Sequence, residues 1–344
     1  MSFIRDMILW IGVMEIFIIF YVLMNIIAFS LYAIDKRRAE KNLWRISENT
    51  LIFFTLACGA IGALIGMRVF RHKTQKLKFK IAVIIGLVIA IIPVIHIVHG
   101  ATIDRVAHIV EHEFRSENWP PELDGYRIAF MADFHIIEDE TMQDIVTELN
   151  ERNIDLLLLG GDFSMRDSHY QGTLREISRT STTDGIFGVE GNHDCYIRLF
   201  AAKEYYGITP LDNSGVRIRE GFYLAGVQDL WNREPNIAGA TAGSYQGDFV
   251  LLVTHNPDVS MEQSTMGVNL IFAGHTHGGQ MTFFGFPFIL WLGNITRYGT
   301  RFARGFNYSA DGVPVFTSVG VGHDHGVQRI FSRLEVVVFT LYSK

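Results

Sequence analysis

The sequence contains only two cysteines, Cys58 and Cys195, among its 344 residues. Cys58 lies inside an apolar run and Cys195 far along the polar half, so we expect neither a disulfide nor a zinc site built from thiolates. The chain also lacks an excess of basic residues, since its net charge is −6. This balance excludes a globally basic nucleic-acid-binding protein, and we expect no nucleic-acid partner.

Hydrophobic residues make up 49% of the chain, which is high for a purely soluble protein, and they concentrate in the first hundred residues. Apolar runs near 7–34, 51–70 and 80–99 are each about long enough to cross a hydrocarbon core, which takes roughly 20 residues. A cleaved signal peptide fits the first run poorly, because the run is too long, lacks a small-residue cleavage site and is followed by two further runs. We expect residues 1–100 to form a multi-pass helical domain in the cell membrane.

Both connections between these runs are basic, DKRRAEKNLWRISEN at 35–49 and RHKTQKLKFK at 71–80. Three simple crossings would place them on opposite sides of the membrane, which conflicts with the tendency of basic loops to remain cytoplasmic. The glycine-rich CGAIGALIG at 58–66 offers an alternative, because it could pack tightly or form a re-entrant segment that leaves both loops cytoplasmic. The sequence leaves open the side on which the second half lies.

The elements IDK, RISE and RHKT in this half resemble a family of small bacterial integral-membrane proteins of unknown function, over about residues 20–95. The resemblance implies no chemistry. Residues 101–124 are predicted to form a linker that ends in the proline-rich NWPPELDG. Within it, HIVEH at 108–112 matches the H-x-x-E-H pattern of a class of zinc peptidases. No third ligand is nearby, so we favour an amphipathic linker helix.

Five apolar runs in the polar half each switch abruptly to Asp, His or Asn, which predicts five strands with polar residues at their ends. These runs are YRIAFMADFH, IDLLLLGGDF, GIFGVEGNHD, FVLLVTHNPD and VNLIFAGHTH. Apolar residues at Met142, Ile145, Val146 and Leu149 have helical spacing and predict a β-α-β crossover between the first two runs. Further on, GVRIRE and GFYLAGVQD predict a hairpin, and VPVFTSVG and RLEVVVFTL predict closing strands. We expect residues 125–344 to form a mixed α/β domain of two packed sheets with flanking helices.

The polar strand ends supply a set of possible metal ligands. Ligands bind beyond the carboxyl ends of the strands in such sheets, so we expect these side chains to meet there. Carboxylate, amide and imidazole donors without thiolates suit Mn, Fe, Zn or Co. Seven ligands are too many for one zinc, but fit two metals that share a bridging carboxylate, a centre suited to displacement at phosphorus. The seven residues are Asp133, His135, Asp162, Asn192, His255, His275 and His277.

Five motifs resemble, in order, the five signature blocks of the calcineurin-like metallophosphoesterases: DFH, GGD, GNHD, TH and GHTHGG. The resemblance covers about residues 125–342 and is to the compact prokaryotic, membrane-associated branch of that family. The resemblance implies a four-layered α/β/β/α sandwich. It implies that His193 contacts the substrate phosphate and protonates the leaving oxygen, and that Asp194 orients the His193 ring. It also divides the ligands: Asp133, His135 and His277 for the first metal, Asn192, His255 and His275 for the second, and Asp162 as the bridge.

His275 and His277 are separated by one threonine in LIFAGHTHGGQ. Alternate residues of an extended strand point to opposite faces. Two histidines that bind neighbouring metals therefore require a bend in the backbone between Gly274 and Gly278.

The substrate is predicted less directly. An aromatic stretch begins with MTFFGFPFILWLGN at 281–294 and continues to residue 301. A core strand would explain part of it, but Gly285 and Pro287 interrupt any regular strand, so the alternative is a loop at the site mouth or the bilayer surface. Our working hypothesis is hydrolysis of a phosphodiester or pyrophosphate bond in a lipid or envelope precursor by a metal-bridging hydroxide. The alternative is a membrane scaffold or sensor with a catalytically silent phosphoesterase domain. His323 and His325 could contact substrate or an additional metal, or lie in a solvated loop.

Overall fold

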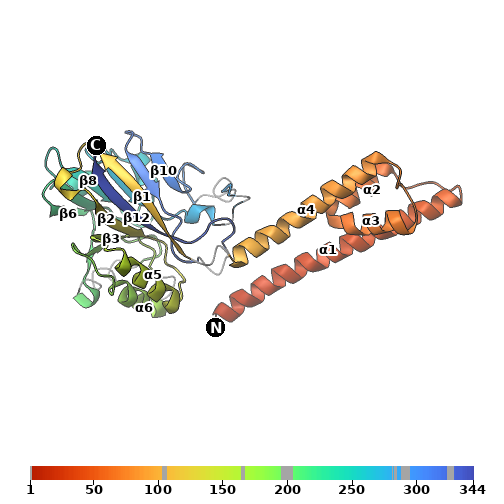
Figure 1. The fold of residues 1–344 in the computed structure, drawn as a ribbon, viewed down its shortest axis with the longest axis horizontal. Helices are drawn as coiled ribbons and strands as arrows, with labels where there is room; N and C mark the ends of the chain where they lie inside the picture. The colour runs from red at the N-terminus through yellow and green to blue at the C-terminus, as the bar shows by residue number, and fades with distance from the viewer. Residues whose placement is uncertain are drawn as a thin grey trace. The chain divides into compact units, whose positions relative to one another are not determined.

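The computed structural model divides the chain into two compact units, Met1–Val98 and His99–Lys344, which are described separately (Figure 1). It describes residues 2–102, 107–163, 167–194, 204–280, 282, 285–287, 295–323 and 329–344, with side chains throughout except at 2–17, 93, 96, 97, 99–102 and 167–169.

The first unit is helical. Its elements are α1 (Ser2–Glu40), α2 (Glu48–Phe54), the π-turn η1 (Thr55–Gly59), α3 (Ala60–Val69) and α4 (Leu77–Thr102). Among the described residues, Ile18–Glu40 and Glu48–Val69 are long and apolar enough to cross a membrane by length and composition. The third predicted span, 80–99, lies in α4, where part of the side chains are outside the described set.

The segment Glu48–Val69 is a hairpin and not a straight helix. Its backbone leaves helical geometry at Ala57 (φ −77°, ψ 52°) and Cys58 (φ 66°, ψ 9°). Glu48, at the start of α2, forms an ion pair of 2.7 Å with Lys73, just after α3. A straight helix of 22 residues would separate its ends by about 33 Å. The structure therefore shows a hairpin whose two ends lie together, which is the geometry that a re-entrant segment would need.

Glycines and one asparagine allow the hairpin to pack closely on α1. A Cβ on Gly62 would lie 1.9 Å from the backbone oxygen of Asn25, and one on Gly59 would lie 2.7 Å from the Cβ of Ala28. The Asn25 amide donates to the carbonyl of Cys58 at 2.9 Å, and its oxygen accepts from the Gly62 N–H at 2.8 Å. These bonds satisfy backbone groups at the break in the helix, which an apolar environment would otherwise leave unpaired.

The second unit contains two sheets of six strands each within the described residues. The first sheet has the order β1 (His108–Ser116), β12 (Glu335–Ser343), β2 (Tyr126–Met131), β3 (Leu156–Leu159), β4 (Ile186–Gly188) and β5 (Ile208–Pro210). The second has the order β10 (Gly305–Tyr308), β11 (Pro314–Thr317), β9 (Leu270–Ala273), β8 (Phe249–Val253), β7 (Phe222–Gly226) and β6 (Ser214–Arg219). The helical elements are η2 (Pro121–Leu123), α5 (Asp139–Glu151), α6 (Asp167–Ile177), α8 (Ile237–Thr241), α9 (Val259–Glu262) and η3 (His277–Gly279).

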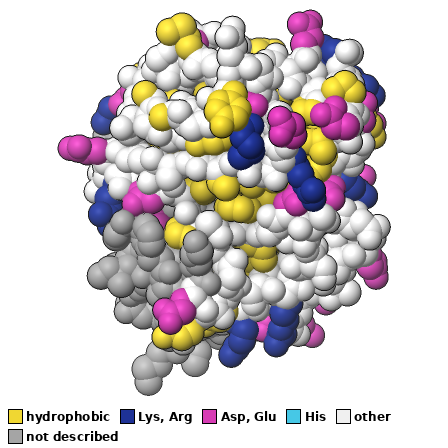
Figure 2. Space-filling view, turned by 90° about the vertical axis from the view of Figure 1, so that its left-hand side faces the viewer, with side chains coloured by type: hydrophobic (Ala, Val, Ile, Leu, Met, Phe, Trp, Pro, Cys, Tyr) yellow, Lys and Arg dark blue, Asp and Glu magenta, His cyan; other side chains and the backbone are white. Residues whose placement is uncertain are grey.

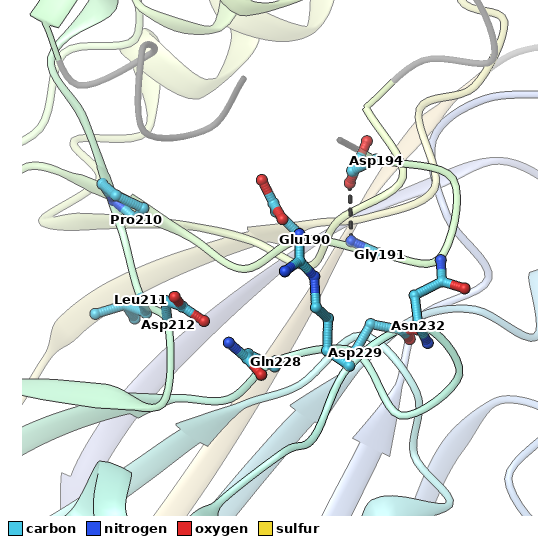
Figure 3. Close-up of a pocket in the computed structure, with 10 residues that line it drawn as sticks. Glu190, Gly191, Asp194, Pro210, Leu211, Asp212, Gln228, Asp229 and Asn232 are labelled. Carbon is cyan, nitrogen blue, oxygen red and sulfur yellow. Dashed lines mark hydrogen bonds between the residues drawn. The ribbon is translucent and has the colours of Figure 1, made fainter. Parts of the chain in front are cut away.

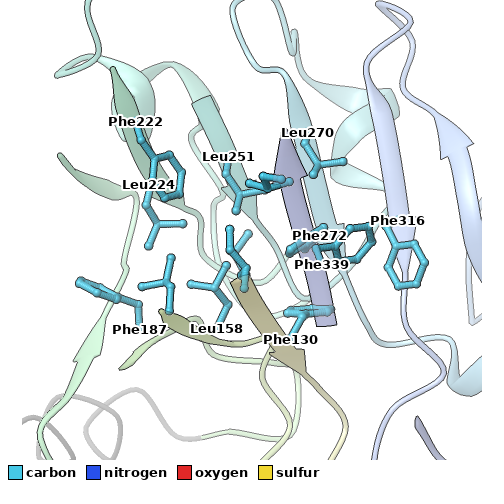
Figure 4. Close-up of a cluster of buried hydrophobic side chains, with 14 of the residues drawn as sticks. Phe130, Leu158, Phe187, Phe222, Leu224, Leu251, Leu270, Phe272, Phe316 and Phe339 are labelled. Atoms are coloured by element: carbon cyan, nitrogen blue, oxygen red, sulfur yellow. The ribbon is translucent and has the colours of Figure 1, made fainter. Parts of the chain in front are cut away.

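Aromatic and aliphatic side chains fill the space between the two sheets (Figure 4). Phe130 and Phe339 come from the first sheet, and Phe272 and Phe316 from the second; the rings of Phe272 and Phe339 lie 4.7 Å apart. Successive residues of a strand point to opposite faces, so each sheet has a second apolar face on its outer side. Each outer face needs a further layer to cover it.

Helices supply these outer layers. In α5, Met142 and Leu149 pack with Leu157 of β3 on the outer face of the first sheet. In α8 and α9, Ile237 and Val259 pack on the outer face of the second sheet. The arrangement confirms the predicted α/β/β/α sandwich, the five predicted strands and the predicted helix between the first two of them.

The surface that Figure 2 shows carries hydrophobic side chains in small groups, separated by basic and acidic side chains. Such a mixture is ordinary for a protein surface that faces water. A face that lay within the hydrocarbon of a bilayer would not carry this density of charged groups.

The predicted linker is wrong at residues 108–116, which form strand β1 and pair in parallel with β12. The ring of His112 stacks on Phe339 with centroids 5.1 Å apart, while Glu111 and Glu113 are exposed. This alternation of inward and outward side chains is typical of a strand with one solvated face. HIVEH is therefore neither a linker helix nor a zinc-binding helix.

Replacing Phe339 by alanine is expected to lower the free energy of unfolding by about 3–5 kcal/mol, because it leaves a cavity between the two sheets. Met266→Ala, at a residue that is 79% exposed, is the control and should change it by less than about 0.5 kcal/mol. Denaturant unfolding of the detergent-solubilised chain, followed by tryptophan fluorescence, measures both. Similar midpoints for the two variants would contradict this assignment of the core.

Candidate metal centre

The predicted ligands follow the carboxyl ends of strands from both sheets. Asp133 and His135 follow β2, Asp162 follows β3, and His275 follows β9. All four are buried, with at most 5% of their surface exposed. The remaining ligands come after β4 and β8 and the bend beyond β9; they are Asn192, His255 and His277.

Five of the seven residues have a positive φ angle: Asp133 (55°), His135 (36°), Asp162 (57°), His275 (72°) and His277 (52°). Residues other than glycine rarely adopt this region, which costs roughly 1–3 kcal/mol at each position and is concentrated at functional sites. These angles turn the chain out of the strand direction, so that neighbouring side chains reach one point. The bend predicted between Gly274 and Gly278 is present, because β9 ends at Ala273 and Gly278 has φ 62°.

The three residues assigned to the first metal lie together. The Nε2 atoms of His135 and His277 are 3.0 Å apart, and their rings stack with centroids 4.8 Å apart. Asp133 Oδ1 lies 3.5 Å from His277 Nε2. The potential ligand atoms of these three residues all lie within 4.8 Å of one another.

The residues assigned to the second metal lie beside this group. His255 Nε2 is 3.0 Å from Asn192 Oδ1 and 3.2 Å from His275 Nδ1. Asp162 Oδ2 is 3.2 Å from His255 Nε2 and 3.4 Å from His135 Nε2, so one carboxylate oxygen contacts both groups. This is the position that a bridging ligand occupies.

These separations fit metal coordination. Ligand atoms at 2.0–2.2 Å from a metal, with bond angles near 90–110°, lie about 3.0–3.5 Å apart. The His255 Nδ1–H donates to the carbonyl of Gly160 at 2.7 Å, and the His275 Nε2–H donates to that of Ile295 at 3.0 Å. A carbonyl only accepts, so each ring carries a proton on that nitrogen, and in its neutral form would present the lone pair of the other nitrogen to the site. The residues present therefore fit a pair of divalent cations.

The electrostatics also favour bound cations. Burial raises the pKa of Asp133 to about 7, with attraction from His255 opposing the shift and repulsion from Asp162 adding to it. Burial lowers the pKa of His275 to about 3, and His255 adds to the effect. Burial, His135 and Arg329 lower the pKa of His277. Neutral imidazoles are the form that binds metals, and a cation would stabilise the crowded carboxylates.

Asp194 joins two of the loops that carry predicted ligands. Its carboxylate accepts hydrogen bonds from the N–H groups of Asp162 at 2.7 Å, Gly191 at 2.8 Å and Phe163 at 2.9 Å; Figure 3 shows the bond to Gly191. These bonds join the loop after β4 to the loop after β3. We therefore assign Asp194 to holding the two ligand loops together, while its predicted role in orienting the His193 ring stays a prediction.

His193 lies at the edge of the centre. Its backbone N–H donates to Asp162 Oδ1 at 2.8 Å, and its exposed ring lies 5.3 Å from that of His135. It lines a pocket of about 280 Å³ together with Trp231, His275 and Ile295. The location suits contact with a substrate, and the role of His193 as a proton donor stays a prediction.

Other predicted features fall beside the site or outside the described residues. The carbonyl of His323 accepts from the N–H of Ile136 at 3.1 Å, so its backbone joins the loop that carries His135. His325 lies outside the described residues. Of the aromatic stretch at 281–294, only 282 and 285–287 are described, and Phe286 is 52% exposed.

Sequence reasoning missed Arg329, which is fully buried. Its Nε donates to the carbonyl of Gly322 at 2.9 Å, and its terminal nitrogens lie 3.3 Å from the carbonyl and 3.2 Å from Nδ1 of His277. It therefore connects the loop before β12 to a predicted ligand. An arginine directly before the apolar Ile330 and Phe331 was the signal that could have indicated a buried role.

Removing metal with a chelator is expected to lower the melting temperature, and adding Mn or Zn to restore it. A cation at 100 times its dissociation constant stabilises the folded state by about 2.7 kcal/mol. Asp162→Asn should abolish this response, whereas His108→Gln, outside the centre, should keep it. Thermal denaturation with and without metal measures the shift, and an unsubstituted chain that does not respond would contradict the assignment.

The comparisons with known proteins agree with this geometry. Residues 126–279 match the family described as calcineurin-like phosphoesterase, and residues 25–79 match a family described as a protein of unknown function (DUF1294). The uncharacterized metallophosphoesterase YkuE of Bacillus subtilis is 27% identical over 68% of this chain and 85% of its own length. A transmembrane protein with metallophosphoesterase domain from Danio rerio is 25% identical over 85% of this chain and 70% of its own length.

The N-terminal half has its own relative. The uncharacterized protein YsdA of Bacillus subtilis is 44% identical over 70 residues, which cover 20% of this chain and 79% of that protein. Two families thus meet in one polypeptide, one on each side of residue 100. The chain therefore contains a calcineurin-like phosphoesterase domain, matched at residues 126–279, and an N-terminal DUF1294 domain, matched at residues 25–79.

Proposed function

We propose that this protein is a membrane-anchored phosphoesterase that hydrolyses phosphodiester or pyrophosphate bonds with two divalent metal ions drawn from Mn, Fe, Zn and Co. The observation that carries the proposal is the position of Asp162, whose Oδ2 lies within 3.4 Å of histidines from both ligand groups. When bound, such a metal pair would polarise the phosphoryl group and activate water.

The chain's own residues supply orientation and a proton. Asp162 holds the backbone of His193 in place, and the exposed His193 ring faces the pocket, where it can donate a proton to the leaving oxygen. Asp194 fixes the loop on which His193 sits through its three backbone hydrogen bonds. Positioning by neighbouring groups is what makes general acid catalysis efficient.

The membrane anchor is supported by the first unit. The helix α1 and the apolar sequence of α4 are 39 and 26 residues long, or about 58 and 39 Å, against a hydrocarbon core of about 30 Å. One similar protein is itself named a transmembrane protein with a metallophosphoesterase domain. An anchored enzyme meets substrates that lie in or near the bilayer, so a lipid or envelope precursor is our proposed substrate class.

The alternative is a membrane scaffold or sensor whose phosphoesterase domain is silent. The convergence of the seven predicted ligands, with His193 beside them, supports catalysis, because a silent domain has no need for five strained ligand positions. Hydrolysis decides between the two proposals.

His193→Ala is expected to lower kcat for a nitrophenyl phosphodiester by about 10²–10⁴-fold, the usual contribution of general acid catalysis. The metal-induced rise in melting temperature should be unchanged, because His193 is not a predicted ligand. His108→Gln is the control. Assays with each of Mn, Fe, Zn and Co measure the effect; a chain that binds metal but hydrolyses nothing would favour the scaffold.

A further inference from the structure

The two basic loops of the first unit lie at the same end of its helices. Residues 36–45 contain five Lys or Arg and residues 68–80 contain six, against three acidic residues in and beside them, Asp35, Glu40 and Glu48. In the sequence, the start of α1 contains Arg5 and Asp6, and Asp104 and Arg105 follow α4, so neither pair has a net charge. The charge asymmetry between the two ends is therefore large.

A buried ion-pair network joins the two loops to the end of α1. Asp35, which is fully buried, accepts from Arg45 at 2.7 Å and from the Ile46 N–H at 3.0 Å in the first loop. Its Oδ2 also lies 2.7 Å from His72 Nε2 in the second loop. Lys73 then reaches Glu48 at 2.7 Å. The IDK, RISE and RHKT elements thus meet in one network.

The hairpin enters the helix bundle only part of the way. Its tip contacts α1 at Asn25, while its open end lies level with Asp35. Ten residues of helix measure about 15 Å, about half of a 30 Å hydrocarbon core. On α4, Phe79 packs against Tyr32 near the open end, and Gly86 meets Thr55 near the tip, so α4 runs past the tip and onward.

We propose that residues 48–69 form a re-entrant hairpin, that both basic loops lie at the cytoplasmic surface, and that the phosphoesterase unit acts on the other side of the membrane. Short loops rich in Lys and Arg remain cytoplasmic. The chain crosses once in α1 and once in α4, and the phosphoesterase unit follows α4. Its substrates are then phosphoesters outside the cytoplasm. The inference rests on the proposed membrane anchoring.

Single cysteines in the full-length chain test this topology, in a background with Cys58 and Cys195 changed to serine. Lys41→Cys probes the first loop, Gln75→Cys the second, and Met266→Cys the phosphoesterase unit; all three positions are exposed. A membrane-impermeant maleimide is applied to spheroplasts before and after permeabilisation. We expect labelling of Met266→Cys in intact spheroplasts, and labelling of the other two only after permeabilisation.

Two results would overturn the proposal. Labelling of the two loop cysteines from opposite sides would show that residues 48–69 cross the membrane completely. Labelling of Met266→Cys only after permeabilisation would place the phosphoesterase unit in the cytoplasm. Nitrophenyl ester hydrolysis by each detergent-solubilised variant is measured in parallel. Loss of activity with the expected labelling would count against the proposed function alone.

A second inference concerns Trp231, which is 46% exposed and lines the pocket beside His193. Its indole meets the His275 ring edge to face, with centroids 4.6 Å apart. Three hydrogen bonds hold the loop that carries Trp231 and its neighbour Asn232. Asp229 Oδ2 accepts from the N–H groups of Trp231 at 2.8 Å and Asn232 at 3.0 Å, and the Asn232 amide donates to the carbonyl of Asn192.

A large aromatic side chain that is half exposed at a pocket, on a rigid loop, is a pre-formed apolar contact surface. We infer that Trp231 determines specificity by packing against an aromatic or other apolar group on the retained side of a phosphodiester. Its neighbour Asn232 donates to the carbonyl of Asn192, and its own ring contacts His275, so an apolar group bound to Trp231 lies close to the predicted metal ligands.

Bis(4-nitrophenyl) phosphate and methyl 4-nitrophenyl phosphate test this role, because they share a leaving group and differ only in the retained one. Trp231→Ala should lower kcat/KM for the aryl diester by about 10-fold, mainly through KM, and leave the methyl diester nearly unchanged. Trp231→Phe should keep most of the preference. An equal loss on both diesters would indicate a purely structural role, and no loss on either would exclude the contact.

Discussion

The burial of the Asp162 carboxylate is the constraint on which the rest of the phosphoesterase unit depends. A buried anion is costly unless neighbouring groups compensate it. Both oxygens of Asp162 have such neighbours. The N–H of His193 donates to Oδ1, and the imidazoles of His135 and His255 lie beside Oδ2. Burial would raise the pKa of Asp162, but attraction from these histidines holds it well below its usual range. The loops that follow β2, β3, β4 and β8 therefore converge on this one side chain.

That arrangement needs a rigid support, which the sandwich supplies. The ligand positions are strained, and strained backbone persists only where the surrounding structure over-determines it. Phe130 of β2 and Phe272 of β9 pack with ring centroids 5.1 Å apart, directly beneath the loops that carry Asp133 and His275. The core thus fixes the separation of the two sheets at the point where their strand ends must meet. The packing of the core therefore helps to set the positions of the predicted metal ligands that follow these strands.

Much of the phosphoesterase unit could be predicted from the sequence, because its strands are continuous apolar runs and its ligands follow them at once. The strand β1 was missed because its inward residues include His112 and its outward residues are charged, a pattern that also suits a linker. The partners of Asp194 could not be predicted, since a carboxylate beside a histidine serves the ring or the backbone equally well. The hairpin could not be decided from the sequence either, because residues 51–67 are almost wholly apolar and the chain turns at Cys58 and not at a glycine.

The pairing of β1 with β12 has a consequence for how the protein is made. His108 bonds to Leu334 across a separation of 226 residues, and within the described part of the chain β1 pairs only with β12, in parallel. The first strand to follow the last helix of the N-terminal unit therefore waits, without its hydrogen-bonding partner, until the final strand has been synthesised. Contacts so distant along the chain form late. The first sheet of the phosphoesterase unit can therefore be completed only after residues 335–343 have been synthesised, long after the N-terminal helices.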